Sequence, residues 1–311
     1  MSLDRLLEGI EKFQNPTVAG LDPMLSYIPT FLQEEAYGKY GRKLEGAASA
    51  LYAFNRGLID ALCPYVPAVK LQCAYYEMYG WPGVHALQRT AAYARKKGMF
   101  VIIDGKRNDI GSTMEAYAAG HLGKAKVMGR GYYPFHGDAL TVNGYLGSDG
   151  IHPLLETCRD EDAGIFVLVK TSNLSSGELQ DQLLQNGEPL YLAMGKMCEK
   201  WGESLPGKYG YSGVGAVVGA TYPQQMEQLR KDLPHTFFLV PGYGAQGGTA
   251  ESVALAFDSR GLGAVVNSSR AIMCAWQKEH CREEEYADAA RREALRMRDQ
   301  IMAHVGKITL K

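Results

Sequence analysis

Short apolar stretches recur along the chain, and most are followed by a longer amphipathic stretch. The apolar stretches are continuous rather than alternating, which is typical of strands that are covered on both faces of a sheet. Eight of them can be counted, at residues 17–21, 66–71, 99–104, 138–142, 164–170, 213–219, 236–240 and 263–267. The pattern predicts eight buried, parallel strands.

Helical spacing of apolar residues fills most of the intervals between these strands. The predicted helices cover residues 44–62, 84–97, 113–128, 179–201, 223–233 and 249–259. Eight strands, most of them followed by a helix, favour a (β/α)8 TIM barrel over a doubly wound α/β sheet. We therefore expect residues 1–311 to form a single barrel domain.

Three segments depart from the repeating pattern. Residues 23–43 follow the first strand and residues 143–163 follow the fourth, and we expect both to be long loops on the C-terminal face, where barrel active sites are built. Residues 278–304 are rich in charges of alternating sign, which predicts an extra, solvated C-terminal helix.

Composition narrows the class of protein. Hydrophobic residues make up 46% and charged residues 22%, which excludes a disordered chain, and the formal net charge of -1 argues against a nucleic-acid partner. The six cysteines form no C-x-x-C motif, so we expect reduced thiols and no metal site. No apolar run approaches a membrane span and no signal peptide opens the chain, so we expect a cytoplasmic protein without a membrane partner.

The third predicted strand ends in a cluster of charges. Asp104 and Lys106 are two residues apart, so on a strand they point to the same face, and Asp109 follows shortly after. Because buried charges are costly unless paired, this spacing fits either a structural ion pair or a catalytic pair. Asp22 and Lys70 close two other strands and would converge on the same mouth.

Glycine is in excess, with 36 residues against about 22 expected at the usual ~7%. Several glycines follow the seventh strand, in residues 241–248, and Arg270 follows the eighth. In barrels these two loops often bind phosphate, because glycines let backbone N–H groups approach an anion. The alternative is an ordinary turn with Arg270 on the surface.

Taken together, these motifs resemble the orotidine 5′-phosphate decarboxylase family, in its longer-chain branch. The family motif D-x-K-x-x-D-I-x-x-T is complete here as Asp104, Lys106, Asp109, Ile110 and Thr113. The resemblance covers most of the chain, apart from the two long loops and the C-terminal tail. The loop of residues 243–248 departs from the commoner Pro-Gly-Ile-Arg sequence.

The resemblance implies decarboxylation of orotidine 5′-monophosphate to UMP in pyrimidine biosynthesis, without a cofactor. Lys106 would deliver the proton to C6 of the pyrimidine, and Asp104 would lie near the carboxylate of the substrate. Lys70 and Asp109 would complete an alternating network of lysines and aspartates that fixes Lys106.

The resemblance also implies roles in substrate binding. Asp22 would bind the ribose, Ser172 the pyrimidine edge, and Gln246 and Arg270 the phosphate. Asp109, with Thr113 beside it, would reach the site of the neighbouring subunit, which implies a homodimer.

The sequence also fits two other functions. One is a Mg²⁺-dependent decarboxylase or aldolase of the same superfamily acting on a keto-sugar phosphate, although the cation of Lys70 would repel a metal ion. The other is a non-catalytic protein that binds a phosphate ligand, against which the complete set of lysines and aspartates argues.

Overall fold

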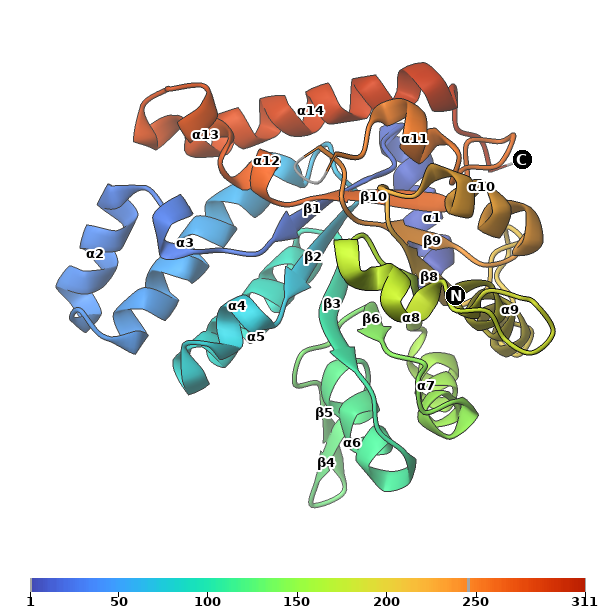
Figure 1. Ribbon diagram of the computed structural model, residues 1–311. Coiled ribbons are helices and arrows are strands. Elements are labelled where there is room, and N and C mark those ends of the chain that lie inside the picture. The colour runs from blue at the N-terminus through green and yellow to red at the C-terminus, as the bar shows by residue number, and fades with distance from the viewer. Residues whose placement is uncertain (1, 245–246, 311) are drawn as a thin grey trace.

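The computed structural model describes residues 2–244 and 247–310, and within them eight parallel strands close into a barrel (Figure 1). The barrel strands are β1 (Thr17–Leu21), β2 (Ala68–Gln72), β3 (Phe100–Arg107), β6 (Ala139–Val142), β7 (Gly164–Lys170), β8 (Val214–Val218), β9 (Phe238–Val240) and β10 (Ala264–Ser268). Their order around the barrel is β1-β10-β9-β8-β7-β6-β3-β2. The predicted (β/α)8 barrel is confirmed, and each predicted strand overlaps an observed one.

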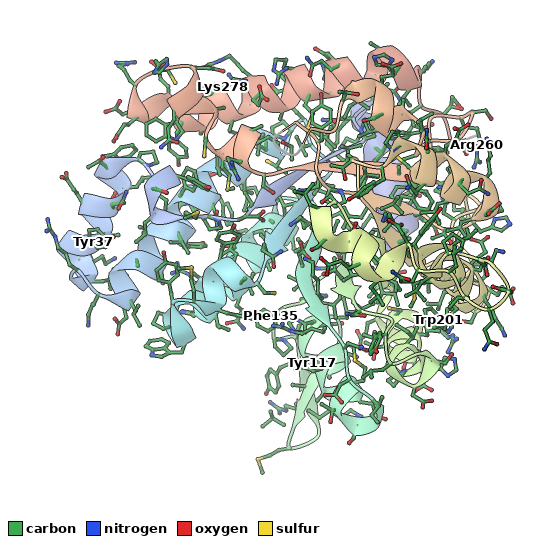
Figure 2. All side chains as sticks on the ribbon, viewed as in Figure 1. Tyr37, Tyr117, Phe135, Trp201, Arg260 and Lys278 are labelled. Carbon is green, nitrogen blue, oxygen red and sulfur yellow. The ribbon has the colours of Figure 1, made fainter. Side chains whose placement is uncertain are left out.

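Helices surround the barrel on its outside, apart from α1, which lies at one end of it (Figure 1). The longer ones are α1 (Ser2–Phe13), α2 (Thr30–Tyr40), α3 (Leu44–Leu62), α5 (Gly80–Lys96), α6 (Gly111–His121), α7 (Ser148–Glu161), α9 (Leu190–Gly202), α10 (Pro223–Asp232) and α14 (Tyr286–Val305). Short helical turns are η1 (Leu25–Tyr27), α4 (Ala74–Glu77), η2 (Leu174–Ser176), α8 (Gly177–Gln180), α11 (Ala250–Ala254), α12 (Arg270–Met273), α13 (Ala275–Lys278) and η3 (Glu283–Glu285). Side chains fill the spaces between neighbouring elements, as at Trp201, whose indole N–H donates to Ser148 Oγ at 3.0 Å (Figure 2).

Two hydrophobic clusters build the core. The larger lies between the outer faces of the strands and the surrounding helices, and the smaller fills the barrel interior. Helix α1 contributes Leu3, Leu6, Leu7 and Ile10 to the interior cluster. Since these four side chains are fully buried, α1 plugs one end of the barrel and leaves the other end for a site.

The two segments predicted as long loops are largely helical. Residues 143–163 were expected as a loop because of their glycines, yet α7 occupies most of them. The cause is the helical spacing of Ile151, Leu154, Leu155 and Cys158, all of which are buried. Residues 23–43 contain η1 and α2. The prediction of a long loop after the fourth barrel strand is therefore wrong, and the segment after the first strand is a helical insertion.

Three predicted helices are shorter than expected, and the one predicted at 249–259 is only the five-residue α11. The helix predicted at 113–128 ends at His121, and a hairpin of β4 (Ala125–Val127) and β5 (Arg130–Tyr132) follows it. The long helix predicted at 179–201 begins at Leu190, and residues 171–189, which include η2 and α8, form a connection that lines the site.

The extra C-terminal helix is confirmed as α14, which lies across α3, α11, α12 and α13 (Figure 1). Within residues 2–244 and 247–310, we find no helix with the length and apolar character of a membrane span.

Candidate active site

A polar layer lies directly above the apolar interior of the barrel. Residues two apart on a strand share a face, so the position two beyond an inward apolar residue also points inward. On four strands this step reaches a buried polar side chain: from Ala68 to Lys70, from Ile102 to Asp104, from Ala139 to Thr141, and from Val265 to Asn267. All four polar side chains line one cavity at the open end of the barrel.

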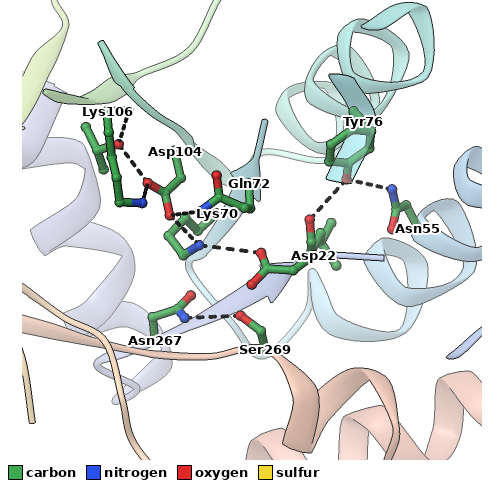
Figure 3. Close-up of polar contacts among 11 residues, drawn as sticks. Asp22, Asn55, Lys70, Gln72, Tyr76, Asp104, Lys106, Asn267 and Ser269 are labelled. Carbon is green, nitrogen blue, oxygen red and sulfur yellow. Dashed lines mark hydrogen bonds and ion pairs between the residues drawn. The ribbon is translucent and has the colours of Figure 1, made fainter. Parts of the chain in front are cut away.

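Four charged side chains in this layer alternate in sign (Figure 3). The ammonium of Lys70 lies 2.7 Å from Asp104 Oδ2 and 3.5 Å from Asp22 Oδ1. Lys106 Nζ lies 2.6 Å from Asp104 Oδ1. The chain Asp22–Lys70–Asp104–Lys106 therefore pairs every charge, as buried charges require. Asp22 is the neighbour of Lys70 on its other side, and the predicted contribution of Asp109, which would come from the neighbouring subunit, stays a prediction.

The two central groups are both charged near neutral pH. Burial would lower the pKa of Lys70, but the carboxylates of Asp104 and Asp22 outweigh it and raise that pKa above its usual value. Burial would raise the pKa of Asp104, but the ammonium groups of Lys70 and Lys106 hold it well below its usual range. A fixed negative charge and fixed positive charges thus face the cavity.

Lys106 has an unusual backbone. Its φ of +48° lies in the left-handed region, which non-glycine residues rarely adopt. The pairing of β3 with β6 is irregular at this place, between Ile103 and Arg107. The side chain of Lys106 is 45% exposed, whereas that of Lys70 is only 6% exposed. The ammonium of Lys106 is therefore the one available to a bound molecule.

The cavity has a volume of about 610 Å³, and its wall is completed by segments that follow β7, β9 and β10. These segments contribute Ser172, Gln180, Gly242, Tyr243, Ser269 and Arg270, among others. Gly219 allows the backbone of Ser172 to approach, since a Cβ at Gly219 would lie 2.8 Å from it. Gly242, Gly244 and Gly247 have φ of +94°, +72° and +94°, which explains the glycines of this loop.

The predicted site residues divide into three groups. Asp22, Lys70, Asp104, Lys106, Ser172 and Arg270 line the cavity together. Asp109 and Thr113 lie outside it in their own chain: Asp109 is half-buried and Thr113 is exposed in the first turn of α6. Gln246 lies outside the described residues, so its predicted phosphate contact stays a prediction.

Other polar residues of the cavity were missed from the sequence. Gln72 Nε2 donates to Asp104 Oδ2 at 3.1 Å, and Thr141 Oγ1 donates to Asp104 Oδ1 at 2.7 Å. Asn267 is buried, and its Nδ2 donates to Ser269 Oγ at 3.2 Å. The signal that could have found Thr141 and Asn267 is a polar residue at an inward position near the C-terminal end of a strand.

This arrangement suits a reaction in which charge develops on a small anionic substrate. A half-exposed ammonium beside a buried carboxylate can stabilise a developing anion and deliver a proton to it. Among the residues that the structure describes, no three His, Cys, Asp or Glu side chains group so as to hold a metal ion.

Comparisons with known proteins agree on one family. The profile of the orotidine 5′-phosphate decarboxylase / HUMPS family matches residues 54–281. The chain is 44% identical to the orotidine 5′-phosphate decarboxylase of Rhodopirellula baltica, covering 92% of this chain and 93% of that one. It is 41% identical to the enzyme of that name from Caldicellulosiruptor bescii, covering 88% and 90%. A crystal structure of a candidate orotidine-monophosphate decarboxylase from Toxoplasma gondii superposes with a TM-score of 0.76 at 29% identity, over 96% and 98% of the two chains.

Proposed function

The chain belongs to the orotidine 5′-phosphate decarboxylase family, and we propose that Lys106 is the proton donor of its reaction and that no cofactor takes part. The chain is a carboxy-lyase that acts on orotidine 5′-monophosphate in pyrimidine biosynthesis. What carries the proposal is the half-exposed ammonium of Lys106 at the end of the charged chain, facing the cavity.

The chemistry needs a cation at one atom of the substrate. Loss of CO₂ leaves an electron pair on C6 of the pyrimidine, and an ammonium at that atom both stabilises the pair and supplies the proton that replaces CO₂. Lys106 becomes neutral in this step, and solvent then returns its proton. The ammonium from which the reaction must start lies 2.6 Å from the carboxylate of Asp104.

Asp104 and Lys70 serve Lys106 in this proposal. Because its pKa is held low, Asp104 stays ionised and would face the substrate carboxylate, which favours departure of CO₂. Lys70 is buried against Asp104 and neutralises it on the side away from Lys106. Stabilisation of the developing negative charge by Lys106 should lower the activation barrier more than repulsion by Asp104 does, since preorganised charge usually supplies the largest part of such a reduction.

The remaining lining residues suit the other parts of a nucleotide. Asp22 would accept hydrogen bonds from the ribose hydroxyls, and Ser172 would contact the pyrimidine edge. Arg270 and the glycine loop beyond Gly242 would hold the phosphate, together with Gln246. Binding energy from a phosphate remote from C6 can then assist the chemical step.

A homodimer would place Asp109 and Thr113 at the site of the neighbouring subunit. The backbone carbonyl of Asp109 lies close to Gly150, at the start of α7. Large apolar side chains are exposed at the next residue, Ile110 (53%), and in the segment before α7, at Tyr145 (75%) and Leu146 (47%). Such a surface favours an interface. Mixing two inactive variants, K106A and D109A, should restore part of the activity if Asp109 acts across the interface, and none if it does not.

We also propose that residues 1–311 form one domain, because α2 and α14 both pack on α3 of the barrel.

The Mg²⁺-dependent alternative is disfavoured by Lys70, whose ammonium occupies the position between the two carboxylates where a divalent cation would sit. Full activity in buffer containing EDTA supports the proposal, and its loss with recovery on adding Mg²⁺ would favour the alternative.

The test of the proposal is the variant K106A. Loss of the substrate absorbance in metal-free buffer should be seen for the wild type and should be abolished in K106A. UMP binding, measured by calorimetry, should remain, because the ribose and phosphate contacts are intact. The control is K231A, which removes an exposed lysine of α10 and should leave turnover unchanged. Near-normal turnover by K106A would exclude Lys106 as the donor.

A further inference from the structure

The irregular pairing of β3 with β6 centres on one residue. Ile103 pairs with Leu140 and Arg107 pairs with Val142, so residues 104–106 of β3 face Thr141 alone on β6. Two extra residues in one strand leave backbone groups without their usual partners in the ladder. A group other than the backbone of β6 must therefore accept the hydrogen bond of the Lys106 backbone N–H.

The hydroxyl of Thr141 fills this role. The backbone N–H of Lys106 donates to Thr141 Oγ1 at 3.0 Å, and the same oxygen donates its own hydrogen to Asp104 Oδ1 at 2.7 Å. A hydroxyl has one hydrogen to donate and lone pairs to accept, so both bonds form at once. Thr141 is 1% exposed, which makes both bonds costly to lose.

These bonds close a ring around Lys106. Asp104 Oδ1 accepts from Thr141 and also from Lys106 Nζ at 2.6 Å. Lys106 is thus held at both ends: its backbone by Thr141, and its ammonium by the carboxylate that Thr141 orients. The left-handed φ of +48° at Lys106 persists because this ring supports it.

We propose that Thr141 is a positioning residue of the decarboxylase, which aims the ammonium of Lys106 by bonding its backbone and by orienting Asp104. This inference rests on the proposed role of Lys106. Thr141 acts through these two residues, so its loss should reduce kcat far more than it changes KM for the nucleotide. The residues proposed to bind the ribose and the phosphate, Asp22 and Arg270, follow other strands and keep their places in the cavity wall.

Two matched variants separate the hydroxyl from the shape of the side chain. T141V keeps the branched shape and removes the hydroxyl, whereas T141S keeps the hydroxyl and removes the methyl group. We expect kcat of T141V to fall on the order of 100-fold, the loss typical of about 1 Å of misplacement, with KM changed less than about threefold on the same reasoning. T141S should recover kcat to near the wild-type value.

Crystal structures of the wild type and both variants complete the test. In T141V, Lys106 should leave the left-handed region or its Nζ should separate from Asp104, whereas T141S should match the wild type. The proposal is overturned if T141V retains wild-type kcat, if T141S is as slow as T141V, or if Lys106 is unmoved in T141V. A wild type without turnover, with Lys106 displaced only in T141V, would instead refute the proposed function and leave the positioning role standing.

Discussion

Lys70 offers the sharpest test of how the charged chain is held together. Its side chain is 6% exposed and lies between Asp104, itself 7% exposed, and Asp22, which is 19% exposed. The variant K70M replaces the ammonium by an apolar group of similar length. K70M leaves Asp104 with the ammonium of Lys106 alone and removes the ion pair of Asp22. We expect this to cost up to about 3–5 kcal/mol in the free energy of unfolding, the loss found when one partner of a buried ion pair is removed.

The pH dependence of this loss follows from Asp104. In the wild type its pKa is lowered, so its contribution to stability is present above the usual value of 3.8 and is lost as pH falls through the folded pKa. In K70M burial still acts and only Lys106 remains, so we expect the pKa of Asp104 to rise well above its wild-type value. The difference in stability between wild type and K70M should therefore be largest at pH 7 and should narrow at pH 4.

The assay is denaturant unfolding of both proteins at pH 7 and pH 4, at one protein concentration so that association contributes equally. The matched control is K124M, which removes a lysine that is 40% exposed and paired with Glu161, and it should change stability little at either pH. An unfolding free energy of K70M equal to that of the wild type at pH 7, or a difference that does not change with pH, would refute this account.

Three further changes test other parts of the molecule. R270A should raise KM about 10- to 100-fold, which corresponds to the free energy of one hydrogen bond to a charged group. An unchanged KM would show that Arg270 does not bind the phosphate. Burial and the neighbouring Arg107 lower the pKa of His121 to about 4. As pH falls, the unfolded chain therefore binds a proton at this histidine before the folded chain does, and the free energy of unfolding of the wild type should fall by about 2 kcal/mol between pH 7 and 5. The variant H121F should not show this fall in the free energy of unfolding, and an equal fall in both proteins would contradict the assignment to His121. D181A removes the carboxylate that lies 2.7 Å from the ammonium of the fully buried Lys170. Because this ion pair ties residues 171–189 to the barrel, limited proteolysis should cleave the segment faster in D181A than in the wild type. Equal rates of cleavage would show that the ion pair does not hold this segment.

The strands were predictable because burial on both faces produces a continuous apolar run that few other structures produce. Helices were less predictable where glycine and helical periodicity disagree. In residues 143–163, Gly144, Gly147 and Gly150 indicated a loop, but the buried stripe from Ile151 to Cys158 forms α7. Packing of one apolar face against the barrel outweighs the low helix propensity of glycine.

The candidate site was predictable in its residue types and less so in its connections. Charged residues at strand ends identified Lys70, Asp104 and Lys106, which the structure does bring together. The contact of Asp22 with Lys70 and the role of Thr141 depend on which strands are neighbours and in what register. These are properties of the closed barrel, and spacing along one strand does not contain them.

The spacing of Asp104 and Lys106 left a structural ion pair and a catalytic pair equally open, and their geometry favours the second. A regular strand would have let both side chains point inward and be buried together, with no cost to the backbone. Instead the backbone of Lys106 adopts a left-handed conformation, which costs about 1–3 kcal/mol. That conformation leaves the ammonium 45% exposed toward the cavity. A pair that served stability alone would gain nothing from this strain, whereas a proton donor needs an ammonium that the substrate can reach.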